Sequence, residues 1–161
     1  MPGLDFLALL QVLARNEVEF IVVGGMSAVL QGVPTVTRDL DVVYRRDAAN
    51  IQRTLAALQS LDARFRIRPD LSPNASHLES TGHKLLNTKL GRLDMLGSIG
   101  QQLTYEDLIE HTDETQVGEF RVRVLQLETL ISMKEELGRE KDLAMLPTLR
   151  ATLAEKRRLT K

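Results

Sequence analysis

The chain has 161 residues, a formal net charge of −1 and no cysteine. This length favours one domain with a real hydrophobic core, and the near-neutral charge argues against nonspecific coating of nucleic acid. The lack of cysteine excludes disulfides, thiolate zinc sites and a cysteine nucleophile, and it fits a cytoplasmic location. No apolar run approaches the length of a membrane span, so we expect no membrane partner. Met1 to Arg15 has no basic start, so we expect an amphipathic helix over about residues 4–15 rather than a signal peptide.

A glycine pair follows the first predicted strand. The strand covers residues 18–23, and Gly24-Gly25 is expected to end it in a tight turn. A short helical pattern covers residues 26–31, so backbone N–H groups at its start would lie beside residues that have no side chain. This pattern predicts an anion site, although a Gly-Gly pair is about as often a turn without a ligand.

The second predicted strand, residues 39–44, begins with two aspartates. Residues two apart on a strand share a face, so Asp39 and Asp41 would present their carboxylates side by side. An apolar periodicity then predicts a helix over residues 48–58. A phosphate-binding turn beside paired carboxylates is what metal-dependent phosphoryl or nucleotidyl transfer requires.

The third predicted strand, residues 64–67, lies in an arginine-rich segment. Arg64, Arg66 and Arg68 alternate with apolar residues, so we expect three guanidinium groups on one face of the strand. Charged side chains often protect an exposed sheet edge from aggregation, which is the simpler interpretation. The functional interpretation is a surface that binds the phosphates of a nucleotide or an RNA.

A hairpin is predicted over residues 84–89 and 92–96. Asp94 interrupts its second strand between apolar residues, and such an aspartate either faces solvent or points into a site. Because Asp39 and Asp41 are already available, we favour the site. Further along the chain, a helix is expected over residues 104–111.

The rest of the chain predicts a strand over residues 120–124 and two helices over 127–137 and 140–156, separated at Gly138. Strands mixed with helices, followed by a helical tail, describe an α+β domain with a mixed sheet of about five strands flanked by helices. We therefore expect one domain over residues 1–161, with a core to about residue 125 and a tail over about 126–161.

The combined pattern resembles a known superfamily. An apolar strand, Gly24-Gly25, a short helix, the segment Thr37-Arg38-Asp39-Leu40-Asp41 and a later strand aspartate are similar to the nucleotidyltransferases of the DNA polymerase beta superfamily. Within it, the chain is most similar to small bacterial stand-alone proteins, including those linked to abortive infection and toxin–antitoxin systems. The resemblance covers about residues 1–150, including the helical tail.

This resemblance implies an enzyme that moves a nucleoside monophosphate from a nucleoside triphosphate, such as ATP, to an acceptor hydroxyl. Two Mg²⁺ ions would be its cofactors, and Mn²⁺ could replace them. The implied catalytic metal ligands are Asp39, Asp41 and Asp94. The implied nucleotide-binding residues are Gly24, Gly25, Ser27, Lys134 and Lys141, although lysines on a helical tail are more often simply solvated.

Two functions of other classes stay open. The first is a non-catalytic interaction protein that keeps the nucleotidyltransferase fold, such as an antitoxin partner. The second is an accessory protein that binds RNA through the arginine strand. For an enzyme, the acceptor would be an RNA such as tRNA or a partner protein, and an oligomer is compatible with the sequence.

Overall fold

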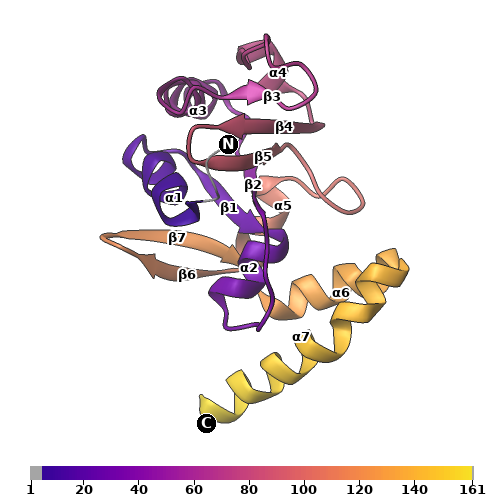
Figure 1. Ribbon diagram of the computed structural model, residues 1–161. Coiled ribbons are helices and arrows are strands. Elements are labelled where there is room, and N and C mark those ends of the chain that lie inside the picture. Colours follow the sequence, from indigo (N-terminus) through magenta and orange to yellow (C-terminus); the bar gives the residue numbers. More distant parts are fainter. Residues whose placement is uncertain (1–4, 161) are drawn as a thin grey trace.

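The computed structural model describes residues 5–160, which form helices around a single seven-stranded sheet (Figure 1). The strands are β1 (Phe20–Val23), β2 (Asp39–Tyr44), β3 (Arg64–Phe65), β4 (His83–Thr88), β5 (Gly91–Leu96), β6 (Thr112–Val117) and β7 (Phe120–Leu125). The α-helices are α1 (Phe6–Arg15), α2 (Gly24–Leu30), α3 (Ala48–Ser60), α4 (Ala75–Glu79), α5 (Tyr105–Leu108), α6 (Leu127–Leu137) and α7 (Glu140–Leu159). A 3₁₀ turn at Ile109–His111 continues α5. The start of the first predicted helix, residue 4, lies outside the described residues.

The sheet is mixed, with the strand order β3-β4-β5-β2-β1-β7-β6. Central strand β2 pairs antiparallel with β1 and parallel with β5, and β1 pairs parallel with β7. Two hairpins, β4–β5 and β6–β7, complete it, together with the antiparallel edge pair β3–β4. The predicted α+β fold with a mixed sheet and a C-terminal pair of helices is therefore confirmed, but the sheet has seven strands where about five were predicted.

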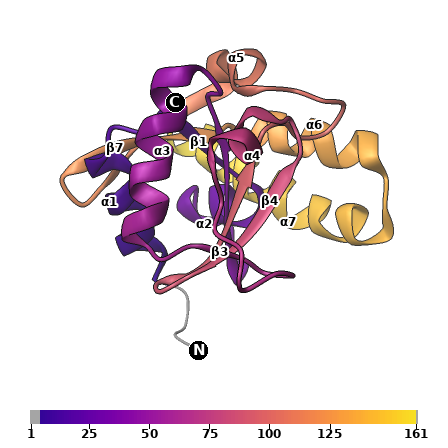
Figure 2. The ribbon, with the colours of Figure 1, turned by 90° about the horizontal axis from the view of Figure 1, so that it is seen from above.

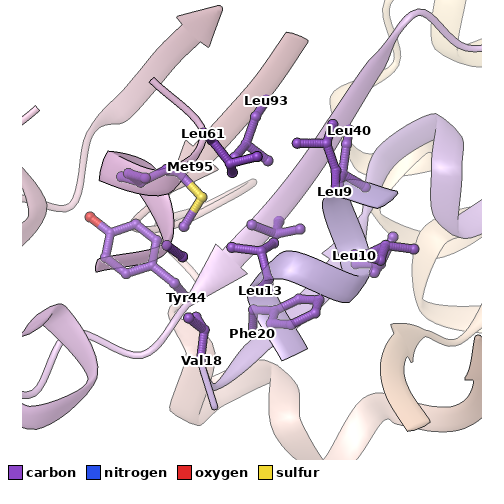
Figure 3. Close-up of a cluster of buried hydrophobic side chains, with 14 of the residues drawn as sticks. Leu9, Leu10, Leu13, Val18, Phe20, Leu40, Tyr44, Leu61, Leu93 and Met95 are labelled. Atoms are coloured by element: carbon purple, nitrogen blue, oxygen red, sulfur yellow. The ribbon is translucent and has the colours of Figure 1, made fainter. Parts of the chain in front are cut away.

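One face of the sheet is covered by α1 and α3, which Figure 2 shows on the same side of the strands. Leu9, Leu10 and Leu13 of α1 recur at helical spacing and are fully buried. They join alternate residues of the strands, among them Leu40 and Leu93, in the cluster drawn in Figure 3. This apolar layer packs against one face of β2 and β5. The residues that alternate with Leu40 and Leu93 along these strands therefore point to the other face.

The opposite face is covered over β1 and β7 by α2, α5, α6 and α7. Its apolar cluster joins sheet residues such as Ile21 and Val43 to Leu130 and Ile131 of α6 and to Leu149 of α7. Near the starts of β2 and β5 the side chains on this face are polar: Asp39 and Asp41 are half-buried, Arg92 is exposed and Asp94 is buried. A site is therefore open over one half of the sheet, beside the helices that cover the other half.

Strand β6 and helix α4 are absent from the prediction, and the strands predicted over residues 18–23 and 64–67 are shorter in the structure, at Phe20–Val23 and Arg64–Phe65. Strand β6 carries mostly polar, exposed side chains, which gives no apolar alternation to detect. Helix α4 is five residues long, and it follows a segment with two prolines. The tail was predicted correctly: α6 ends at Gly138, whose φ of +61° is left-handed, and α7 follows. Within residues 5–160, no helix combines the length and apolar character needed to cross a membrane.

Candidate active site

The sheet register brings the three predicted aspartates to one face. Asp41 and Asp94 are partner positions on the parallel strands β2 and β5, and Asp39 is two residues earlier, opposite Arg92. The alternate residues of both strands are buried in the α1–α3 layer, so all three carboxylates lie on the open face. The structure thus assembles the group that the sequence only suggested.

The pKa of the Asp41 carboxyl group is strongly raised. Burial raises its pKa from 3.8 to about 7, and the hydrogen bond to Asp94 and the negative charges of Asp94 and Asp39 add to this effect. The positive charge of Arg66 opposes the shift. Perturbed carboxyl groups of this kind are typical of functional sites, because close like charges cost stability and are kept where they are used.

Two carboxylate oxygens at this site lack a partner. Asp39 Oδ1 and Asp41 Oδ1 are buried and make no hydrogen bond, and the nearest cation to Asp39 Oδ1 is Arg92 Nη1 at 3.8 Å. Buried polar atoms nearly always have partners, so these oxygens fit a ligand that is itself a cation. Mg²⁺ is commonly held by one or two carboxylates together with substrate phosphates. Within residues 5–160, no group of three acidic, histidine or cysteine side chains forms a metal cage by itself.

Asp94 is engaged by an arginine that sequence reasoning did not place in the site. Arg66 Nη2 donates to Asp94 Oδ1 at 2.8 Å and to the carbonyl oxygen of Leu86 at 2.9 Å, and Nε donates to Asn87 Oδ1 at 3.3 Å. The Arg66 side chain is only 21% exposed, so this contact is screened less than a surface pair. The arginine supplies the counter-charge that allows three carboxylates to lie together.

The predicted face of three arginines is only partly present. Strand β3 ends at Phe65, because the chain turns there and the N–H of Arg68 donates to the carbonyl oxygen of Phe65. Arg64 opposes Asn87 on β4, and the N–H of Arg66 continues the ladder to Leu85. Arg64 and Arg66 therefore share the face that carries the aspartates. Arg68 lies beyond the strand and pairs with Asp70.

The glycine pair lies directly against the aspartates. Helix α2 begins at Gly24, two residues earlier than predicted, and Gly24 has a φ of +63°. A Cβ atom on Gly24 would lie 2.5 Å from Asp41 Oδ2, and one on Gly25 would lie 3.0 Å from the Thr37 side chain. Only glycine allows this approach of the backbone to the carboxylate. The glycine pair, which the sequence predicts to be a phosphate loop, therefore lies against Asp41, to which the sequence linked it only by order along the chain.

Within residues 5–160, the other predicted nucleotide-binding side chains form no hydrogen bond or ion pair with the three aspartates. Ser27 is fully buried, and its hydroxyl donates to the carbonyl oxygen of Gly24 at 2.6 Å. Lys134 Nζ is 3.3 Å from the buried carboxylate of Asp142, which also pairs with Arg139. Lys141 is exposed at the start of α7. Their roles in nucleotide binding stay predictions.

Comparison with known families decides the relationship. The family profile described as aminoglycoside-2''-adenylyltransferase matches residues 5–142. The chain belongs to this family. It is a nucleotidyltransferase family, so the resemblance drawn from the glycine pair and the aspartates is confirmed. No protein with curated annotation matches the sequence significantly.

Two solved structures share the fold of this family member. A candidate nucleotidyltransferase from Thermotoga maritima is 20% identical, with 94% of each chain covered and a TM-score of 0.56. The antibiotic-resistance factor ANT(2'')-Ia is 14% identical, with 93% of this chain and 85% of that chain covered and a TM-score of 0.55. At these identities the likeness concerns the fold.

Proposed function

We propose that this protein transfers a nucleoside monophosphate from a nucleoside triphosphate to an acceptor hydroxyl, in a reaction that depends on a divalent metal ion. The family description favours ATP as the donor. The observation that carries the proposal is the pair of unpartnered buried oxygens, Asp39 Oδ1 and Asp41 Oδ1, beside the backbone of Gly24. A triphosphate brings negative charge to this acidic site, so a bound cation must offset it.

Each residue of the site has a role in this reaction. Asp39 and Asp41 would hold Mg²⁺ or Mn²⁺, which supplies charge neutralisation for the triphosphate and the leaving pyrophosphate. The backbone N–H groups of Gly24 and Gly25, at the start of α2, would bind phosphate oxygens. Asp94 would join the metal or accept the proton of the acceptor hydroxyl, and Arg66, which donates a hydrogen bond to it, would hold it in position.

The bonds that change are few. The acceptor oxygen forms a bond to the α-phosphorus, and the bond from this phosphorus to the oxygen that bridges to the β-phosphorus breaks. Pyrophosphate leaves, and the hydroxyl proton passes to the Asp94 carboxylate and then to solvent. Positioning and charge stabilisation are the main contributions that a protein makes to such a transfer.

The direct test is incubation of the protein with each labelled nucleoside triphosphate, Mg²⁺ or Mn²⁺, and a panel of acceptors that includes tRNA, the protein itself and small alcohols. We expect metal-dependent release of pyrophosphate and a labelled acceptor. Calorimetry with a non-hydrolysable ATP analogue separates binding from turnover. If neither the analogue nor the metal binds, the function is not nucleotidyl transfer, and the non-catalytic interaction protein becomes the better interpretation.

Metal binding should depend on pH through Asp41. Because its pKa in the metal-free protein is about 7, the proton must leave before the carboxylate can bind a cation. We expect the apparent affinity for Mn²⁺ to fall by about tenfold for each pH unit below 7 and to level off above it. Calorimetric titration between about pH 5.5 and 8.5 measures this dependence.

A histidine could produce a similar profile, so His83→Gln is the matched control. His83 lies on β4 with Nε2 3.1 Å from the carbonyl oxygen of Ser98, and histidines titrate in the same range. The variant should keep the wild-type midpoint. A midpoint that disappears in His83→Gln, or an affinity that stays constant across this range, would contradict the assignment to Asp41.

A further inference from the structure

Two rows of side chains cross the open half of the sheet from β2 to its edge. Partner positions in neighbouring strands place them side by side on the same face. The first row is Asp41, Asp94, Leu85 and Arg66. Arg66 belongs to this row because its backbone N–H donates a hydrogen bond to the carbonyl oxygen of Leu85. The second row is Asp39, Arg92, Asn87 and Arg64.

The proposed function divides this surface into a donor side and an acceptor side. Gly24 contacts Asp41 from the side of β1, so the triphosphate would lie there. In an in-line displacement the attacking oxygen approaches opposite the leaving pyrophosphate. The acceptor must therefore approach from Asp94, across β4 and β3. On this path the acceptor contacts the side chains of the two rows that lie beyond the aspartates.

This acceptor side is cationic. Arg92 is 48% exposed, and Arg66 contributes a second guanidinium that reaches Asp94 over Leu85. Arg66 donates its hydrogen bonds to Asn87, Leu86 and Asp94 from Nε and Nη2, so Nη1 is the nitrogen that would bind a ligand. The only acidic residues in the two rows are the three aspartates themselves. During the reaction their charge would be offset by the metal and by the proton taken from the acceptor. Asp62 pairs with Arg64 at the far edge.

Such a surface is wrong for an aminoglycoside. Aminoglycosides are polycations, and recognition of their ammonium groups needs carboxylates beyond those used in catalysis. Arginine instead matches phosphate, which it binds through two parallel hydrogen bonds. The half-exposed Leu85 lies between Asp94 and Arg66, where it offers an apolar contact for a sugar or base.

We propose, on the basis of the proposed function, that the acceptor hydroxyl belongs to a phosphate-bearing compound whose phosphate binds Arg92 and Arg66. The phosphate lies next to the reacting hydroxyl, since Asp94 and Arg66 are in direct contact. The terminal nucleotide of an RNA and a small sugar phosphate share this chemistry. A family member with this surface acts on an anion rather than on a polycationic antibiotic.

The test measures acceptor binding with the donor site filled. The protein is saturated with Mg²⁺ and a non-hydrolysable ATP analogue and titrated with ribose, ribose 5-phosphate, a short RNA with a free 3′-hydroxyl, and kanamycin. We expect ribose 5-phosphate or the RNA to bind at least about tenfold tighter than ribose, and kanamycin to bind no better than ribose. Tight binding of ribose 5-phosphate identifies a small acceptor, and tight binding of the RNA alone identifies a nucleic-acid end.

Variants assign the binding to the arginines. Arg92→Gln and Arg66→Gln should each lower the affinity for the phosphate-bearing acceptor by about tenfold, and each should reduce the salt dependence of its binding. Arg121→Gln is the matched control, because Arg121 lies on β7 at the far side of the sheet and is 74% exposed. Arg92 is partly exposed at the start of β5, so its variant should fold even if the Arg66 variant does not.

The outcomes separate the two proposals. If the ATP analogue does not bind, the proposed function fails and this inference falls with it. If the analogue binds but kanamycin binds more tightly than both phosphate compounds, the function stands and the anionic acceptor is wrong. The same conclusion follows if neither phosphate compound binds, or if Arg92→Gln has no larger effect than Arg121→Gln.

Discussion

Asp41→Asn is expected to lower nucleotidyl transfer by about 10²- to 10³-fold while making the metal-free protein as stable as wild type or more stable above neutral pH. The variant keeps the shape of the side chain but loses the charge that would hold the metal. It also removes a carboxylate that is repelled by Asp39 and Asp94. Activity and stability should therefore change in opposite directions.

The sign of the stability change follows from the pKa. Asp41 has a pKa of about 7 in the folded protein and 3.8 as its model value. Between these values the folded state binds more protons than the unfolded state, so this group makes stability fall as pH rises. Asp41→Asn abolishes that loss. Thermal melts without metal should show no gain near pH 4 and a gain of about 0.5–2 kcal/mol near pH 8, modest because the site is partly wet.

Asp142→Asn is the matched control for this result. Asp142 is a buried carboxylate whose hydrogen bonds to Arg139 and Lys134 lower its pKa to about 2. Its contribution to stability is present above the pKa of the unfolded state and is lost as pH falls toward 2. This variant should melt below wild type at neutral pH, with its response to metal unchanged. If Asp41→Asn behaves in the same way, Asp41 is a structural residue.

Local sequence signals were sufficient for the parts of the fold that have a clear period. The strand before Gly24, the pair Asp39 and Asp41, the hairpin with Asp94 and the two tail helices all follow from apolar spacing and glycine positions. Strand β6 was missed because its side chains are polar and largely exposed at the sheet edge. Its place in the fold depends on its partner β7 rather than on its own pattern.

Long-range pairing explains what the sequence could not show about the site. Arg66 reaches Asp94 only because the chain from β3 pairs with β4, which in turn pairs with β5. Its position along the chain suggested only an arginine-rich strand. Ser27 is a second example: helix α2 begins at Gly24, so the serine falls one turn into the helix, and its hydroxyl donates back to Gly24 instead of facing a ligand.

The contact between the glycine pair and the aspartates supports a second large effect. Gly24→Ala should weaken binding of both Mn²⁺ and an ATP analogue by about 10- to 100-fold, because the new Cβ would lie 2.5 Å from Asp41 Oδ2 and must displace this carboxylate. The left-handed φ of +63° adds a backbone strain of about 1 kcal/mol.

Gly32→Ala separates the two causes, because Gly32 also has a left-handed φ, +91°, but no atom within 4 Å of an added Cβ. Both variants should lose about 1–2 kcal/mol of stability through backbone strain, whereas only Gly24→Ala should lose ligand affinity. Melting curves and calorimetric titrations of the two variants side by side measure these effects. Equal affinities in Gly24→Ala, Gly32→Ala and wild type would show that the glycine keeps the backbone conformation and has no part in ligand binding.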